Sequence, residues 1–258
     1  MTLAVEELAI RRGGRVLIAG VSFTVAPGEM LAVIGANGAG KSTLLHALVG
    51  DLAPSAGRVA FDGRALGAFD RRERARRIAF LAQASALAFP FTVREVIALG
   101  RSPHATGRAA DAAVIDAVAK ATDIAHLMPR AYTRLSGGEK QRVQLARVLA
   151  QIGSAEDAAA RLLLLDEPVA SLDIGHQSLI MRSLRRCAAT GVAIVFVGHD
   201  VSLAAAHADR LLALAEGTTV AWGTPAEVVT EATLARVFDA QTHVIPHPVT
   251  GTPVVLHD

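Results

Sequence analysis

A glycine-rich segment near the N-terminus has the residue types and spacing of a phosphate-binding loop. Residues 35–43, GANGAGKST, fill every fixed position of the pattern G-x-x-x-x-G-K-[ST]. Lys41 is expected to reach the β- and γ-phosphates of a nucleotide, and the Ser42 hydroxyl is expected to hold Mg²⁺. A chance glycine-rich turn is the alternative, but an apolar strand before the loop and a helix after it favour the anion site. The predicted nucleotide-binding residues are Gly35, Ala36, Asn37, Gly38, Ala39, Gly40, Lys41, Ser42 and Thr43.

An acidic pair, Asp166-Glu167, directly follows the apolar run 162–165. Open α/β sheets bind ligands at the carboxyl ends of their strands, so both carboxylates are expected at the ligand site. Asp166 can hold Mg²⁺ through water, and Glu167 can orient and polarise an attacking water. Acidic residues also begin ordinary loops. Beside a complete phosphate loop, however, the catalytic interpretation is favoured.

A second glycine-rich loop, LSGGE at residues 135–139, opens a helix that continues to Leu149. The N-terminus of this helix is a second potential anion site. Ser136 followed three residues later by Glu139 is also the pattern of a capping box. The two interpretations are compatible, because such a cap would aim the backbone N–H groups at a phosphate.

The elements that must position these loops indicate an α/β fold. The apolar runs 30–34, 162–165 and 192–197 are typical of parallel strands covered by helices on both faces. Residues 3–10 and 16–25 predict an antiparallel hairpin. Further strands are predicted at 57–63 and 78–82, helices at 43–49, 71–77, 93–99 and 109–122, and a surface loop at 152–161.

Composition excludes several classes of protein. The 258 residues are 52% hydrophobic and 19% charged, which indicates a globular chain with a substantial core. A formal net charge of +2 gives no general case for a nucleic-acid partner, and the basic run 71–77 is more typical of a solvated helix face. The single cysteine, Cys187, excludes an internal disulfide and suits a reducing compartment. No apolar run reaches the roughly 18 residues of a membrane span, and no secretory signal opens the chain, so a cytoplasmic location is expected.

Taken together and in order, the motifs resemble those of the ATP-binding subunits of ABC transporters. They are the phosphate loop 35–43, Gln83, the signature LSGGE at 135–139, Asp166-Glu167, the D-loop Ser171-Leu172-Asp173, and His199. The resemblance implies a P-loop NTPase (RecA-like) core with an N-terminal antiparallel β subdomain and an inserted ABC helical subdomain. It divides a single domain, 1–258, into a core of 1–84 and 150–222, a helical subdomain of 85–149 and a C-terminal extension of 223–258.

The resemblance also implies a head-to-tail dimer in which each ATP lies between one phosphate loop and the partner copy's signature. Ser136 and Gly138 would contact the γ-phosphate across the dimer, with Gly137 in the same loop. Asp173 would communicate between the two sites. The catalytic residues implied are Glu167, His199, which would contact the γ-phosphate, and Gln83, which would sense the attacking water; the magnesium ligands implied are Ser42, Gln83 and Asp166.

The chain departs from the family pattern at several positions, and one of them concerns how adenine is held. Relatives often carry an aromatic residue near position 12 that stacks on adenine, whereas this chain has Arg11-Arg12. Arginine can stack on a base through its guanidinium plane, which leaves the stacking residue open. The C-terminal histidines His243, His247 and His257 lack metal-ligand spacing and are expected to be structural.

The cargo can be inferred only by resemblance. Residues 89–104 (FPFTVREVIALGRSPH), the long loop before Leu162 and the tail 244–248 resemble the hemin import ATP-binding proteins of Gram-negative bacteria. The resemblance implies hemin import through a transmembrane permease dimer that also links to Gln83, with a periplasmic hemin-binding protein as an indirect partner. The chain would then lie at the cytoplasmic face of the bacterial inner membrane. The apolar stretch 84–93 could dock a permease helix or pack internally.

Other functions remain as alternatives. An importer of ferric siderophore or cobalamin belongs to the same group. A soluble ABC ATPase acting on the ribosome or DNA is disfavoured, because such proteins usually carry two cassettes or a long coiled-coil insertion. A kinase-like P-loop enzyme would leave the signature loop without a role.

Overall fold

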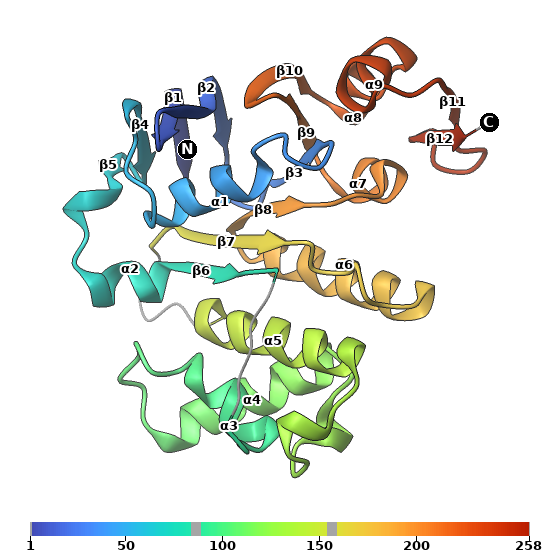
Figure 1. Cartoon of the computed structure of the whole chain (residues 1–258). Helices are drawn as coiled ribbons and strands as arrows, with labels where there is room; N and C mark the ends of the chain where they lie inside the picture. Colours follow the sequence, from blue (N-terminus) through green and yellow to red (C-terminus); the bar gives the residue numbers. More distant parts are fainter. Residues whose placement is uncertain (1, 84–88, 154–158, 258) are drawn as a thin grey trace.

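The computed structural model describes residues 2–83, 89–153 and 159–257 and contains a largely parallel sheet between two layers (Figure 1). The strand order is β10-β9-β3-β8-β7-β6; β10 alone pairs antiparallel, with β9. The bounds are β3 Met30–Gly35, β6 Ile78–Leu81, β7 Arg161–Asp166, β8 Val192–Val197, β9 Arg210–Ala215 and β10 Thr218–Gly223. The predicted α/β class and its buried parallel strands are confirmed.

Alternate residues of the central strands face two different hydrophobic cores, because successive side chains of a strand point to opposite faces. Leu31 and Val33 pack with helix α1 (Lys41–Val49), whereas Met30 and Ala32 pack on the other face. That other face is covered by α5 (Gly137–Ile152), α6 (Ile174–Ala189) and α7 (Val201–His207). Both faces of the sheet are therefore buried, and the polar loops lie at the ends of the strands.

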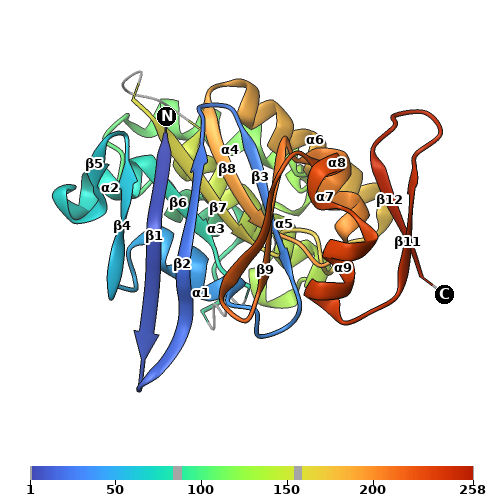
Figure 2. The same ribbon diagram turned by 90° about the horizontal axis from the view of Figure 1, so that it is seen from above.

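An antiparallel sheet of order β2-β1-β4-β5 covers the α1 side of the parallel sheet, as the view from above shows (Figure 2). Its strands are β1 Leu3–Arg12, β2 Arg15–Val25, β4 Ala56–Phe61 and β5 Arg64–Ala65. The predicted N-terminal hairpin is confirmed by the antiparallel pairing of β1 with β2. The hairpin brings the start of β2 toward the phosphate loop.

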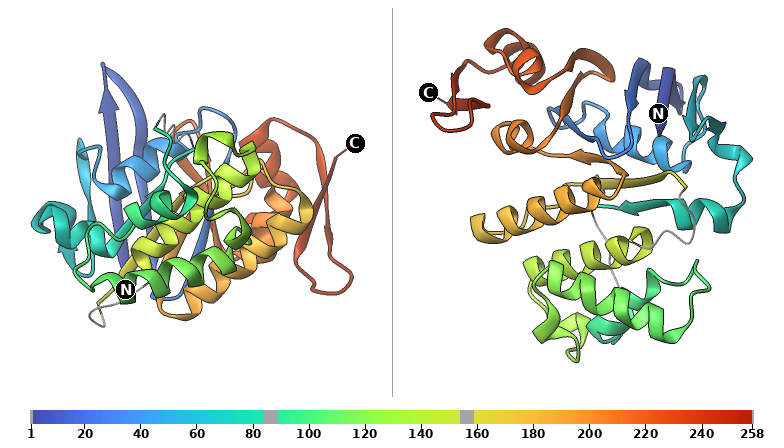
Figure 3. Two further views of the ribbon diagram at one scale, coloured as in Figure 1. Left: turned by 90° about the horizontal axis from the view of Figure 1, so that it is seen from below. Right: turned by 180° about the vertical axis from the view of Figure 1, so that it is seen from behind.

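A helical region lies beyond the β6 side of the sheet and has a core of its own (Figures 1 and 3). It contains α3 Val93–Leu99, α4 Arg108–Ala121, the short turns η2 Ala125–Leu127 and η3 Tyr132–Arg134, and α5. Val143 of α5 belongs to this core, whereas Leu145 belongs to the core under the sheet. The predicted boundary between residues 149 and 150 thus falls inside one continuous helix. The division into subdomains stays a prediction.

Smaller elements complete the chain. The basic run forms α2 (Arg71–Arg77) after the turn η1 (Leu66–Ala68), but Arg77 pairs with Glu73 and Asp62 and lies over the Phe61 ring, so this arginine does not belong to a solvated face. The C-terminal extension contains α8 Pro225–Val228, α9 Glu231–Phe238, β11 Thr242–Pro246 and β12 Pro253–His257.

Several sequence predictions concern segments that are only partly described. Residues 84–88 of the apolar stretch and 154–158 of the expected surface loop lie outside the described residues. Within the described ranges, no helix has the length and apolarity to cross a membrane. The same residues contain no cluster of His, Cys, Asp and Glu side chains suited to a metal ion.

Candidate nucleotide-binding site

The phosphate loop connects the carboxyl end of β3 to the first turn of α1. Gly40 caps α1 in the left-handed region, at φ 98°. An added Cβ at Gly40 would lie 2.8 Å from Ile18 Cδ1 and 2.9 Å from the Leu17 carbonyl oxygen. Glycine is required there both by backbone conformation and by the close approach of β2. The first backbone N–H groups of α1, which have no partner within the helix, therefore follow a loop whose position is fixed by β2.

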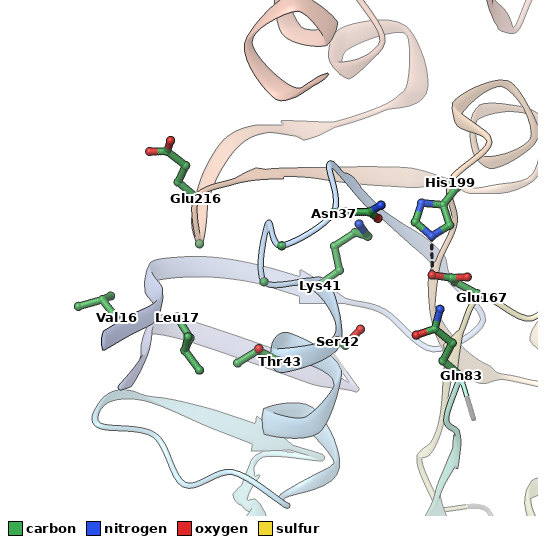
Figure 4. A pocket seen from close by; sticks show the side chains of 13 residues that line it. Val16, Leu17, Asn37, Lys41, Ser42, Thr43, Gln83, Glu167, His199 and Glu216 are labelled. Carbon is green, nitrogen blue, oxygen red and sulfur yellow. Dashed lines mark hydrogen bonds and ion pairs between the residues drawn. The ribbon is translucent and has the colours of Figure 1, made fainter. Parts of the chain in front are cut away.

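This loop forms one wall of a cavity of about 610 Å³ (Figure 4). The cavity is lined by Val16, Leu17, Asn37, Gly38, Gly40, Lys41, Ser42, Thr43, Gln83, Glu167, His199, Glu216 and Gly217. Lys41, Gln83, Glu167 and His199 come from four separate parts of the chain and meet here. Of the other predicted loop residues, Ala36 and Ala39 line a neighbouring cavity of about 540 Å³, and Gly35 ends β3.

Lys41 is almost buried, with 7% of its surface exposed. Its Nζ donates hydrogen bonds to the carbonyl oxygens of Gly35 (2.7 Å) and Ala36 (2.9 Å). Burial lowers the pKa of Lys41, and the carboxylates of Glu167 and Asp166 oppose that shift. A phosphate in the cavity would offer this desolvated ammonium a charged acceptor in place of two neutral carbonyls.

Asp166 ends β7, directly before the cavity-lining Glu167, and has 3% of its surface exposed. Burial raises the pKa of this carboxyl group, and a hydrogen bond from the Ser42 side chain partly offsets the rise. Its Oδ1 is buried without a hydrogen-bond partner among the described residues. An orphaned carboxylate oxygen beside a serine hydroxyl fits the oxygen ligands that Mg²⁺ prefers.

Glu167 follows Asp166 in the left-handed region, at φ 51°. A non-glycine residue held there is strained, and such strain is frequent at functional sites. Two backbone contacts hold the conformation: the Glu167 N–H donates to Val197 O (3.2 Å), and its carbonyl accepts from Gln141 Nε2 (3.1 Å). The carboxylate is hydrogen-bonded to His199 Nε2, another side chain that lines the cavity (Figure 4).

The signature loop lies outside this cavity. Ser136 caps α5: its Oγ accepts from the Glu139 N–H (3.3 Å), and the Glu139 carboxylate accepts from the Ser136 N–H (2.7 Å). The predicted capping box is confirmed, and the hydrogen bond from the Ser136 N–H lowers the pKa of Glu139. Gly137 and Gln83 line a separate cavity of about 190 Å³. Ser136, Gly137, Gly138 and Asp173 are all absent from the lining of the nucleotide cavity among the described residues.

The sequence predictions missed Val16, Leu17, Glu216 and Gly217, which line the cavity beyond the loop. The Gly217 N–H donates to Ala39 O (3.1 Å), and an added Cβ would lie 2.4 Å from Leu17 O. A Glu-Gly pair between two apolar runs predicts a hairpin turn, but nothing local indicates that the turn reaches the phosphate loop. No Phe, Tyr or Trp is among the described lining residues, and Arg11-Arg12 is not among them either.

Comparison with known proteins identifies the family. The ABC transporter family matches residues 18–170. The chain belongs to the ABC transporter family. The hemin import ATP-binding protein HmuV of Pseudomonas entomophila is 47% identical over 98% of this chain and 99% of its own length. HmuV of Myxococcus xanthus is 46% identical over 99% of this chain and 97% of its own length. One solved structure shows an ABC transporter described as of a putative metal-chelate type, in an inward-facing conformation. It aligns with 98% of this chain and 95% of its own chain, with a TM-score of 0.80 and 26% identity.

Membership of the ABC transporter family identifies the nucleotide as ATP and confirms the P-loop NTPase fold. The cavity's phosphate loop, its acidic strand end and the apolar side chains of Val16 and Leu17 agree with that ligand. The geometry also separates the predicted residues into two groups, one around Lys41 and one around Ser136, on different surfaces of the same chain.

Proposed function

We propose that this chain is the ATP-hydrolysing subunit of an ABC importer, and that its cargo is hemin carried through a separate transmembrane permease. The cargo rests on the relatives, which are named hemin import ATP-binding proteins and match this chain over nearly its full length. Hydrolysis rests on one observation above the others. The lysine of the phosphate loop and a hydrogen-bonded Glu167–His199 pair line the same cavity.

In the proposed reaction, Lys41 leaves the loop carbonyls and binds the β- and γ-phosphate oxygens of ATP. Glu167 orients a water for attack on the γ-phosphorus and accepts its proton, while the bond from the γ-phosphorus to the β–γ bridging oxygen breaks and ADP leaves. His199, which already contacts the Glu167 carboxylate, is close enough to the cavity to donate to the γ-phosphate as its charge develops. Gln83 faces the same space from the end of β6 and contacts the attacking water.

The proposal includes Mg²⁺, for which Ser42, Asp166 and Gln83 are the candidate ligands. The buried Asp166 carboxylate, its orphaned Oδ1 and its bond from Ser42 support this assignment. A bound Mg²⁺ would neutralise charge on the β- and γ-phosphates. Without a cation, the buried charge of Asp166 would be only partly compensated by Ser42 and Lys41.

The proposed active form is a head-to-tail dimer. Ser136, Gly137 and Gly138 open α5 on a surface away from the phosphate loop of their own chain, so a second copy would have to supply them to the ATP. The N-terminus of α5 would then complete the γ-phosphate site with its N–H groups and the Ser136 hydroxyl. ATP binding would close such a dimer, and hydrolysis would reopen it.

The remaining partners are a permease dimer in the bacterial inner membrane, with this chain on its cytoplasmic face, and a periplasmic hemin-binding protein that the chain does not touch. The exposed Phe89, which begins the described part of the apolar stretch, packs on Phe91 and could contribute to permease docking. No nucleic-acid partner is proposed.

Reconstitution in proteoliposomes with the permease that co-purifies with this chain would test the cargo. Hemin with its binding protein should stimulate ATP hydrolysis and accumulate inside the vesicles, whereas Lys41→Ala should abolish both. Ferric siderophore and cobalamin serve as comparison cargoes. Stimulation and uptake with one of these instead of hemin would contradict the hemin assignment while leaving the ATPase assignment intact.

A further inference from the structure

His176, in the first turn of α6, has a carboxylate near each of its two ring nitrogens. Asp173 caps α6: its Oδ1 accepts from the His176 N–H (2.9 Å), and its Oδ2 lies 2.6 Å from His176 Nδ1. The other ring nitrogen, Nε2, lies 3.6 Å from Asp123 Oδ2. Asp173 belongs to the D-loop and Asp123 to the helical region, so the imidazole of His176 bridges two parts of the fold.

Asp123 is itself held by the signature helix. Arg142 of α5 lies 3.4 Å from Asp123 Oδ2, and only 8% of the arginine side chain is exposed. The Arg142 Nε has no hydrogen-bond partner among the described residues. A largely buried guanidinium depends strongly on its carboxylate, so Asp123 is positioned by α5.

Other contacts join the same two regions. Ser183 Oγ of α6 donates to Ala121 O at the end of α4 (2.8 Å), and Gln141 of α5 donates to the carbonyl of Glu167. An added Cβ on Gly138 would lie 3.3 Å from Ser171 O. Figure 3 shows α6, in orange, running beside the green helices of the helical region. The signature helix and the D-loop of one chain therefore form a joined surface.

A cap on α6 requires only Asp173. The N–H of His176 would satisfy the Asp173 carboxylate as a cap with any side chain at position 176. The ring is not needed for that role, yet both of its nitrogens face carboxylates on different elements. The contacts of the imidazole ring therefore point to a role other than capping the start of α6.

We propose that His176 is a positioning residue that holds the Asp173 carboxylate in register with the signature helix, through Asp123 and Arg142. This inference rests on the proposed function, in which Asp173 and the signature act across the dimer. A shift of the helical region would then move Asp173 together with the signature loop. Both groups that one chain presents to its partner, Asp173 and the signature loop, would therefore change position together.

The test compares His176→Ala with His176→Gln and with His126→Ala, an exposed histidine in the same region, as matched control. His176→Ala should lower the steady-state kcat for Mg-ATP about threefold to tenfold, the range of a partly exposed charge-assisted contact. Nucleotide affinity and melting temperature should stay at the parent values, because the phosphate loop and the α6 cap are unchanged. His176→Gln, whose amide can still bridge, should recover part of kcat, and His126→Ala should match the parent.

A second measurement separates positioning from a general loss of stability. If His176 acts through Asp173, then Asp173→Ala and the double variant with His176→Ala should have the same kcat. Additive losses, a parent-like kcat in His176→Ala, or a loss of melting temperature that His176→Gln does not restore would overturn the inference. The proposed function has its own readout: it fails if the parent chain does not hydrolyse Mg-ATP.

Discussion

Replacing Glu167 by glutamine removes the proposed base while disturbing little else. Glutamine has the same length, can keep a hydrogen bond to His199 and does not alter the backbone contacts to Val197 and Gln141. The left-handed backbone at φ 51° disfavours both side chains similarly, so the folded state should be equally stable. The melting temperature without nucleotide is expected to stay at the parent value.

The expected loss is kinetic. The Glu167 side chain is 15% exposed and lines the cavity, where its carboxylate is hydrogen-bonded to His199. A positioned general base contributes about 10²–10⁴-fold to rate. At 1.36 kcal/mol per tenfold, this corresponds to about 2.7–5.4 kcal/mol of barrier height. Single-turnover hydrolysis of Mg-ATP should slow by that factor while equilibrium ATP binding persists, and closed dimers should accumulate on gel filtration with ATP.

Glu216→Gln supplies a control within the same cavity. Glu216 also has a positive φ, of 49°, and lies at the opposite end of the cavity from Glu167 (Figure 4). Its neutralisation removes one negative charge from the cavity without touching the Glu167–His199 pair, so the single-turnover rate should remain close to the parent's. A Glu167→Gln variant that hydrolyses ATP at the parent rate would refute the assignment of Glu167 as the base.

Other substitutions test the remaining parts of the site. Lys41→Ala should lose at least about 10²-fold in hydrolysis, because the phosphate charge is left uncompensated, and normal turnover would reject the phosphate-loop assignment. Ser136→Arg should bind ATP but not hydrolyse it, and mixing it with Lys41→Ala should restore activity if sites are shared between chains; no recovery at any ratio would argue against sharing. Burial raises the pKa of Asp166, so ionisation of its carboxyl group destabilises the folded state. This destabilisation is absent at a pH below the ordinary pKa of an aspartate, and it is complete at a pH above the raised pKa of Asp166. At pH 7.5 without Mg²⁺, Asp166→Asn should therefore raise the melting temperature, by about 2–4 °C for each 1 kcal/mol relieved, while Mg²⁺-dependent hydrolysis is lost; an unchanged or lower melting temperature would contradict the buried-charge argument.

The local chemistry of the site follows from residues that are close together in the sequence. The phosphate loop, the acidic pair after β7 and the Ser136–Glu139 box each depend on residues a few positions apart, and each forms on the element expected for it. The pattern of apolar residues also predicted the parallel strands, because strands buried on both faces consist of unbroken hydrophobic runs. It gave no indication that α5 serves two cores, since one helix can carry apolar residues on more than one face.

By itself, the sequence determined which residues can do chemistry and which family pattern they follow. Only the tertiary structure decided three contacts of the site. Gly217 packs against Leu17 in the lining of the ATP cavity, and the Glu167 carbonyl accepts a hydrogen bond from Gln141 of the signature helix. His176 lies between Asp173 and Asp123. The physical reason is separation along the chain. Caps, turns and strands follow from interactions within a few residues, whereas these contacts join distant segments and exist only once the helices have packed on the sheet.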